Sequence, residues 1–415
     1  MLVGVMGMRW RAVASATVAA VLAVTAACGT SETTEDTAAQ PTAEPTGEPT
    51  GEPTATVVDG FEWTPVELDI DVGNIAPAGD GFVGTRVPSD ADQPGVIGVV
   101  ATSPDGVTWT DVTDTGLASD EFVSWIVGGS GQWGAIGQVA GLDDEWLTAD
   151  LLFTPDGAEF VRATVPANVT GLDGTVGITA AAVGETGTVA LAGTQEAFEG
   201  YMGQPGTLGV VALFSEDLQT WEQVQIGSAD LKGMPPIAAS PAGFVVLGAE
   251  ESIFYSPDGR QWEQVSLPVE WEPSPAEGSY VGVMSVAGWR DGFVLVTQQP
   301  SLVLTSTDGR TWTPAQSEPL PDFGDNPGGN TWALGSSLGA LVVSVPFEPA
   351  QGGAAVFSSD GQTWQTWSTD DPIAWPSGGE NTAMGEQAIV LRIQDMGQDG
   401  PPTGTSLWIG TPATE

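Results

Sequence analysis

The 415-residue sequence contains no histidine, one cysteine, and only nine lysine and arginine residues against 54 aspartate and glutamate residues. The absence of histidine excludes Ser–His–Asp hydrolysis, histidine acid–base catalysis and histidine-ligated metal sites. A single cysteine excludes an intrachain disulfide. The formal net charge of −45 repels nucleic acid and anionic lipid head groups, so we expect no nucleic-acid partner. We interpret this acidity as a source of solubility outside the cell rather than as a sign of a specific cationic partner.

The first segment has the features of an export signal. Arg9 and Arg11 precede a short apolar run, Ala12 to Val24, which is too short to span a bilayer comfortably. Small residues then lead to the only cysteine, in the order Thr25-Ala26-Ala27-Cys28. This segment resembles the lipobox of bacterial lipoproteins, and the resemblance implies cleavage before Cys28 and diacylation of its thiol, which gives a firm anchor. The alternative is an ordinary signal peptide cleaved nearby.

The next segment is rich in Thr, Glu, Pro, Ala and Gly, and it contains the near-repeat Glu-Pro-Thr-Gly at 44–47 and 48–51. It has too few apolar residues to build a core, so we expect an extended, disordered tether. The predicted organisation is a signal peptide at 1–27, a tether at 28–57 that begins at the lipidated cysteine, and a folded domain at 58–415. This arrangement places the domain on the extracellular face of the cell membrane, in contact with the membrane through the lipid anchor only.

One turn motif recurs along the predicted folded domain. It reads Ser-Pro-Asp-Gly-x-x-Trp at 103–109 and returns about every 50 residues, a spacing typical of propeller blades. Asp-Gly favours a hairpin turn, because glycine accepts positive φ and the carboxylate can accept hydrogen bonds from backbone N–H groups. One copy has Phe160 in place of Trp, and another has Leu218 in place of Gly. The motif aspartates are Asp105, Asp156, Asp217, Asp258, Asp308 and Asp360.

The residues around the motif predict the fold. Two short apolar runs precede each copy, so each unit reads as strand, Gly turn, strand, loop, strand, Asp turn, strand, which is a four-stranded antiparallel blade. After the sixth motif the chain supplies only two more strands, near 388–391 and 406–409, and a half copy of the motif at 59–63 supplies the missing outer strand at 63–68. The sequence therefore predicts an all-β, seven-bladed β-propeller whose last blade is closed by the N-terminal strand.

The motif resembles the Asp-box of sialidase-like and BNR-repeat propellers, over roughly residues 58–415. In that family Asp-boxes are structural and lie on the face away from the active site, so the resemblance implies that any function lies on the opposite face. Sialidases also hold a substrate carboxylate with three arginines. Here only Arg86 and Arg392, on the second strands of the adjacent blades 1 and 7, could point at a central site. Two arginines do not make that triad, so we do not expect sialidase activity.

The face opposite the Asp turns is the candidate binding face. By our strand assignment it carries long, acidic loops in four adjacent blades, at 394–405, 87–95, 139–149 and 194–207. An aromatic and acidic lobe on one side of a ring is a reasonable binding surface, and the alternative is ordinary loop variation with tryptophans that pack locally. The candidate residues are Trp146, Tyr201, Trp271, Trp332, Trp375, Arg86 and Arg392.

We expect no metal site and no cofactor. The acidic stretches 89–92, 143–145 and 322–325 offer the oxygen ligands that Ca²⁺ takes, but none has EF-hand spacing and most acidic loops are simply solvated. The leading hypothesis is a monomeric, non-catalytic binding or scaffold module for an extracellular protein or glycan. The alternative is a glycoside hydrolase or lyase that acts on extracellular polysaccharide, because carboxylate catalysis needs only Asp and Glu.

Overall fold

The computed structural model of the protein describes the parts of the chain that form its sheets and the turns at one end of them. The described residues are 56–58, 60–66, 72–86, 99–118, 121–128, 134–141, 150–166, 169–170, 172, 176–194, 210–226, 236–248, 252–271, 282–298, 301–315, 330–345, 354–367, 382–396 and 402–413. They belong to one compact unit, residues 54–91 and 96–415. The described residues form strands and turns and no helix, so among them there is no helix that could span a membrane.

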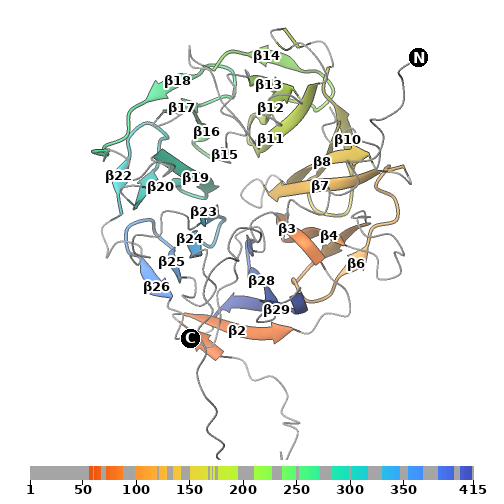
Figure 1. Cartoon of the computed structure of the whole chain (residues 1–415), viewed down its shortest axis with the longest axis vertical. Helices are drawn as coiled ribbons and strands as arrows, with labels where there is room; N and C mark the ends of the chain where they lie inside the picture. The colour runs from red at the N-terminus through yellow and green to blue at the C-terminus, as the bar shows by residue number, and fades with distance from the viewer. Residues whose placement is uncertain are drawn as a thin grey trace, which may run out of the picture. The chain divides into compact units, whose positions relative to one another are not determined.

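The strands form seven antiparallel sheets, which are the blades of a seven-bladed β-propeller around a central axis (Figure 1). In each blade the first strand is innermost. Blades 1 to 3 are β3 (Val72–Ala78), β4 (Gly81–Arg86), β5 (Val99–Ser103), β6 (Thr110–Asp111); β7 (Glu121–Gly128), β8 (Ala135–Gly141), β9 (Asp150–Thr154), β10 (Val161–Thr164); and β11 (Val176–Gly184), β12 (Gly187–Thr194), β13 (Val211–Ser215), β14 (Glu222–Val224).

The remaining blades follow the same order. Blades 4 to 6 are β15 (Ile237–Ser240), β16 (Gly243–Leu247), β17 (Ile253–Ser256), β18 (Glu263–Val265); β19 (Gly282–Trp289), β20 (Gly292–Gln298), β21 (Leu302–Ser306), β22 (Thr313–Pro314); and β23 (Asn330–Gly335), β24 (Ala340–Val345), β25 (Ala354–Ser358), β26 (Gln365–Trp367). Blade 7 is β27 (Thr382–Met384), β28 (Ile389–Met396), β29 (Pro402–Pro412), then β2 (Phe61–Val66) and β1 (Thr56–Val58). This architecture confirms the predicted fold class.

Blade 7 closes the ring with strands from both ends of the chain. Strand β2 pairs antiparallel with β29, from Phe61 opposite Pro412 to Val66 opposite Leu407. The predicted closing strand is therefore present, although it begins two residues earlier than expected. The short strand β1 adds a fifth member outside β2, with Thr56 opposite Trp63, so the sheet begins within the segment that we expected to be tether.

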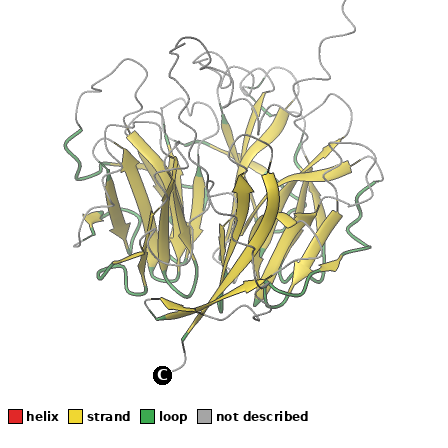
Figure 2. Ribbon diagram, turned by 60° about the horizontal axis from the view of Figure 1, so that its bottom comes forward, coloured by secondary structure: helices red, strands yellow, loops and turns green. Residues whose placement is uncertain are grey.

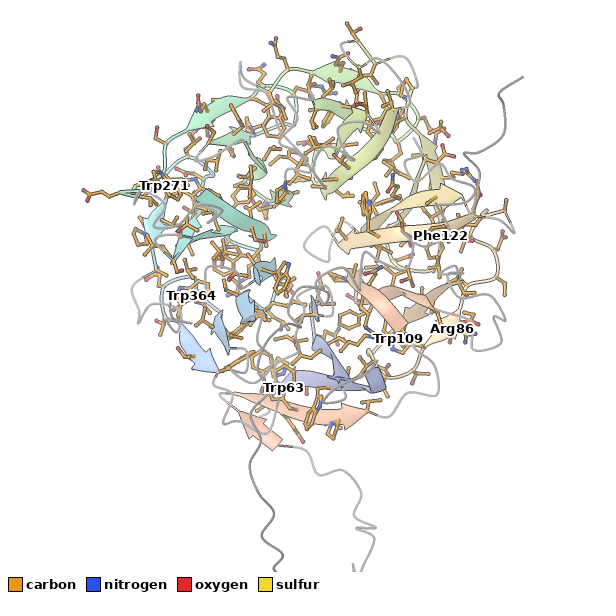
Figure 3. All side chains as sticks on the ribbon, viewed as in Figure 1. Trp63, Arg86, Trp109, Phe122, Trp271 and Trp364 are labelled. Atoms are coloured by element: carbon orange, nitrogen blue, oxygen red, sulfur yellow. The ribbon has the colours of Figure 1, made fainter. Side chains whose placement is uncertain are left out.

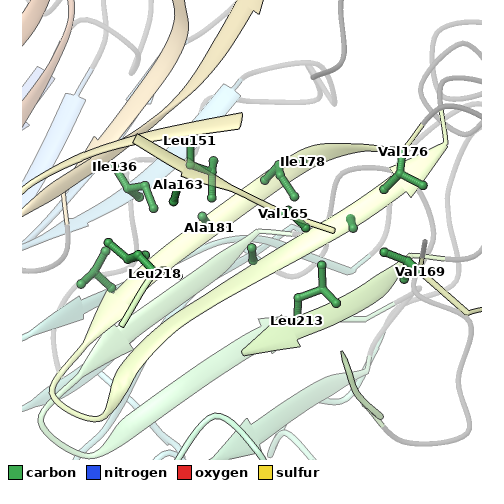
Figure 4. Packing of buried hydrophobic residues seen from close by; sticks show 13 residues of the cluster. Ile136, Leu151, Ala163, Val165, Val169, Val176, Ile178, Ala181, Leu213 and Leu218 are labelled. Atoms are coloured by element: carbon green, nitrogen blue, oxygen red, sulfur yellow. The ribbon is translucent and has the colours of Figure 1, made fainter. Parts of the chain in front are cut away.

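Each core lies between two neighbouring blades, because both faces of a blade pack against a neighbour. The strand β16 is buried at every position from Gly243 to Leu247, as is typical of a strand covered on both faces. Between blades 2 and 3, apolar side chains such as Ile136, Leu151 and Ile178 form one cluster (Figure 4). The apolar runs from which the strands were predicted thus supply the side chains of these inter-blade cores.

Two of the expected loops include residues that belong to strands. The segment 394–405 is mostly strand, because β28 continues to Met396 and β29 starts at Pro402, with those two residues paired. Strand β8 likewise continues to Gly141, so residues 139–141 of the loop expected at 139–149 belong to a strand. In both segments, polar and glycine residues that we interpreted as loop continue the backbone pairing of a strand. This continued pairing explains both differences.

Candidate functional site

The strand order gives the propeller two distinct faces. In an antiparallel blade the turn between the first and second strands and the turn between the third and fourth lie at the same end of the sheet. The Asp turns join third to fourth strands, so they share one face with the short Gly turns. Figure 2 shows many of these described turns, in green, along the lower side of the blades. The other ends of the strands define the candidate binding face.

Each Asp turn is held by one carboxylate. In the first copy, Asp105 Oδ1 accepts hydrogen bonds from the backbone N–H groups of Val107 (2.9 Å) and Thr108 (2.7 Å), and from the hydroxyl of Ser103 (3.1 Å). The indole N–H of Trp109 donates to the preceding glycine carbonyl at 2.9 Å and fixes the ring beside the turn. The pair of backbone hydrogen bonds recurs at Asp156, Asp217, Asp258, Asp308 and Asp360.

These hydrogen bonds lower the pKa of the carboxyls of Asp105, Asp217, Asp258, Asp308 and Asp360. At Asp105, Asp258 and Asp308 partial burial alone would raise the pKa, but the hydrogen bonds from backbone N–H groups and hydroxyls together outweigh it. At Asp217 the hydrogen bond from the Thr220 hydroxyl is the largest cause, and the pKa lies well below its usual range. A carboxyl held ionised in this way is a poor general acid. The Asp turns therefore suit a scaffold and not proton transfer.

The glycine that follows the motif aspartate lies against the preceding blade. Gly259 has φ of +77°, and a Cβ there would lie 2.5 Å from Cδ2 of Phe214 in blade 3. Gly361 has φ of +70°, and its Cβ would lie 2.6 Å from Cζ2 of Trp289 in blade 5. Where the motif lacks glycine, Leu218 adopts φ of +60° and packs its side chain into the core between blades 2 and 3. Each of these turns thus joins two blades as well as two strands.

Two arginines strengthen this inter-blade contact. Arg260 lies over the ring of Phe214, with Cζ 4.0 Å from the ring centroid, and it pairs with Glu222 of the same preceding blade. The ring quadrupole attracts the guanidinium in a contact of this kind. The arrangement is repeated one blade further on by Arg310, Tyr255 and Glu263. Both arginines thus contribute to the packing of neighbouring blades on the Asp-turn face.

Two further arginines also hold the scaffold. Arg162 pairs with Asp150 and, at 2.8 Å, with Glu121, so it connects the outer, third and innermost strands of blade 2. The hydrogen bonds from this arginine lower the pKa of the Glu121 carboxyl. Arg290, in a Gly turn of blade 5, donates to two carbonyls of blade 6, including that of Ser337 at 2.9 Å.

Arg86 and Arg392 lie at the seam between blades 1 and 7. Arg86 is opposite Val72 in the sheet and Arg392 is opposite Leu407, and both of these apolar partners belong to the core of that seam. Arg86 pairs with Asp111 at 3.4 Å, on the outermost strand of its own blade (Figure 3). This ion pair directs the Arg86 guanidinium outward across the sheet and away from a central clamp. Arg392 is 7% exposed.

Two of the predicted aromatic residues pack locally. Trp271 is half-buried against the core between blades 4 and 5, and Trp332, on β23, is half-buried against the core between blades 6 and 7. This packing agrees with the local-packing alternative for these two residues. The other predicted residues and stretches, Trp146, Tyr201, Trp375, Cys28, 89–92, 143–145 and 322–325, lie outside the described residues.

The innermost strands contain β-bulges that the sequence analysis missed. The register shifts in β3, β7, β11 and β19, each in the half of the strand that is nearer the candidate binding face. The residues at these bulges include Asn74, Ser124, Thr179 and Met284. At Asn74, Ser124 and Thr179 the signal in the sequence was a polar residue inside a largely apolar strand, and Met284 offered no such signal. A polar residue of this kind does not identify a bulge until the pairing is known.

Comparisons with solved structures find other propeller-like chains at low similarity. YCF48 bound to a D1 peptide is 15% identical, with a TM-score of 0.44, and the match covers 86% of this chain and 99% of that one. A mutant of Aleuria aurantia lectin in complex with Fucalpha1-6GlcNAc is 12% identical, with a TM-score of 0.36 and coverage of 71% and 94%. A thermostable family-43 glycoside hydrolase is 10% identical, with a TM-score of 0.33 and coverage of 76% and 97%.

No family model and no curated protein matches the sequence. Function must therefore be argued from the residues. Within the part of the chain that the structure describes, no group of three or more Cys, Asp or Glu side chains is placed to hold a metal ion. The described Asp turns place fixed, ionised carboxylates on the face opposite the candidate binding face.

Proposed function

We propose that this protein is a lipid-anchored, extracellular propeller that binds a protein or glycan partner and does not catalyse a reaction. The observation that carries the proposal is the use of the arginines. Arg260, Arg290 and Arg310 hold neighbouring blades together, and Arg86 and Arg162 are paired within their own blades. These cations already have scaffold partners, so they are poor candidates for clamping a substrate.

We further propose that the Asp turns are Asp-boxes in the sense of sialidase-like and BNR-repeat propellers. The support is the shared turn chemistry of six spaced copies, in which one carboxylate oxygen accepts two backbone hydrogen bonds. The structural use of the motif leaves the opposite face for binding. The same proposal places Cys28 at the membrane, since the tether after it would hold the propeller away from the lipid surface.

The anchor is tested by replacing the cysteine. In cells that express the full chain, Cys28→Ala should release the protein into the medium, because no thiol remains to be acylated. Ser31→Ala, three residues further along the same segment, is the matched control and should leave the protein in the membrane fraction. Membrane retention of Cys28→Ala equal to that of the wild type would contradict the anchor.

Binding is separated from catalysis with the purified chain. It is applied to glycan arrays and used to capture extracellular proteins, and in parallel it is incubated with a broad panel of glycosides and polysaccharides. The proposal predicts a saturable ligand that is recovered chemically unchanged. Turnover that a single Asp→Asn or Glu→Gln change on the candidate binding face abolishes would overturn the proposal and establish the glycoside hydrolase or lyase alternative.

A further inference from the structure

Two acidic side chains meet where blades 7 and 1 adjoin, on the Asp-turn face. Glu386 lies in the Gly turn between β27 and β28, and Asp80 lies in the Gly turn between β3 and β4. Their carboxyl groups are hydrogen-bonded to each other across the seam. The turn backbone is close to blade 1 as well, because a Cβ at Gly385 would lie 2.8 Å from Cζ of Phe82. This contact therefore lies beside the blade that closes the ring (Figure 1).

Neighbouring blades hold both turns in place. On the blade 7 side, the Ser337 hydroxyl of blade 6 donates to the backbone carbonyl of Glu386 at 3.4 Å. On the blade 1 side, a Cβ at Gly79 would lie 3.2 Å from Cα of Asp156 in blade 2. Each turn is thus confined on the side away from the seam, so the two carboxyl groups cannot separate without moving a neighbouring blade.

The surroundings of the two acids are acidic or uncharged. Within the part of the chain that the structure describes, no cationic side chain pairs with either acid. Arg290, which reaches the blade 6 turn, donates to two carbonyls there and pairs with Asp291. The flanking Asp turns add Asp105 and Asp156, whose carboxylates accept hydrogen bonds from their own backbone. Neither acid is therefore neutralised by a neighbouring cation.

The contact between the two acids depends on a proton. An ionised carboxylate only accepts hydrogen bonds, so one of the two groups must be protonated for them to bond. When both are ionised, two like charges remain close together and repel. Burial, the charge of Asp80 and the hydrogen bond with it raise the pKa of the Glu386 carboxyl. Glu386 is half-buried and Asp80 is exposed, so Glu386 is the group that retains the proton.

We propose that Glu386 and Asp80 form a pH-sensitive contact between blades 7 and 1, stabilised by one shared proton and weakened when both groups ionise. The inference does not depend on what the propeller binds. Because folding raises the pKa of Glu386, the stability that the protonated form contributes is fully present below about pH 4 and is lost as the pH rises through the folded pKa. This dependence is opposite in sign to that of the Asp turns, whose carboxyls are stabilised as anions.

The test compares Glu386→Gln with Glu185→Gln in the full chain. The glutamine amide can donate to Asp80 at every pH, so Glu386→Gln keeps the contact and removes the titration. Glu185 also follows a glycine in a two-residue Gly turn, in blade 3, and is exposed. Glu185→Gln removes the same charge outside the seam and is the matched control. Asp80→Asn is a second variant, because its amide can donate to the Glu386 carboxylate. Thermal unfolding is measured from about pH 4 to about pH 8.

Glu386→Gln should raise the midpoint of thermal unfolding by about 1 °C or more at about pH 8 and leave it unchanged at about pH 4, and Asp80→Asn should do the same. Glu185→Gln should follow the wild type throughout. Hydrogen exchange at the higher pH should be slower in Glu386→Gln than in the wild type at the turns 78–81 and 385–388, and equal at 184–187. A profile of Glu386→Gln parallel to that of the wild type, a lower midpoint at the higher pH, or an equal gain in Glu185→Gln would overturn the inference.

Discussion

Replacing Gly259 with alanine tests the idea that Asp turns join neighbouring blades. The φ of +77° at this position costs an alanine about 1–2 kcal/mol. The new methyl group would also lie 2.5 Å from Phe214 Cδ2 and 3.0 Å from Val189 Cγ2, both on side chains that are almost fully buried. Overpacking of that kind costs about 1–3 kcal/mol. We therefore expect Gly259→Ala to lower the free energy of unfolding by about 2–5 kcal/mol.

Gly116→Ala is the matched control for this substitution. Gly116 has a similar φ of +70°, but a Cβ there would meet nothing within 4 Å, so only the backbone cost of about 1–2 kcal/mol remains. Urea unfolding followed by tryptophan fluorescence measures both variants, since the chain has 16 tryptophans. Equal loss of stability in the two variants would refute the packing argument, because the difference between them is the contact with blade 3.

Two further predictions concern ring closure and acid. Trp63→Ala should destabilise the protein by about 3–5 kcal/mol, because the ring is fully buried and makes an edge contact with Trp367, with ring centroids 5.7 Å apart. The control is Thr64→Ala, at an exposed position of the same strand, which should change stability by less than about 0.5 kcal/mol. Thermal unfolding measures both variants, and similar losses of stability would contradict the role of Trp63 in ring closure. Because folding lowers the pKa of Asp258, the ionised carboxylate stabilises the folded protein above the unfolded pKa, and this stabilisation is lost as the pH falls below about 4. Asp258→Asn should therefore be less stable than the wild type at neutral pH and should lose less stability on acidification. Parallel profiles of stability against pH for the wild type and the variant would refute this.

The architecture was predictable because its determinants are local. Asp-Gly turns, glycine before apolar runs and a fixed spacing specify four strands per blade, and the half copy at Trp63 specifies how the ring closes. Each of these signals depends on turn chemistry and on burial, and both can be recognised within one short stretch of sequence. The same local chemistry explains why the motif residue Asp105 holds its own turn in the structure.

The inter-blade features were not predictable in the same way. The contact of Arg260 with Phe214 joins residues 46 positions apart, and no pattern within either segment indicates it. The bulge at Asn74 depends on the pairing register of β3 against β4. An extra residue shifts that register but leaves the amino-acid composition of the strand much as before, so composition does not indicate it. Strand β1 was missed because three residues of β-branched character at the end of a polar segment are too short a signal. For Arg86, the sequence placed the residue on the correct strand but could not show its outward pairing with Asp111.

The pairing of β2 with β29 also sets an order of events during protein synthesis. Strand β2 is made long before its partner strand, residues 402–412, with which it pairs from Phe61 opposite Pro412. The ring therefore cannot close on a nascent chain until those residues have left the ribosome. Until then β2 has no C-terminal partner and the edge of β28 is exposed, a condition that favours aggregation or misassembly. Closure of the propeller is thus coupled to the synthesis of residues 402–412.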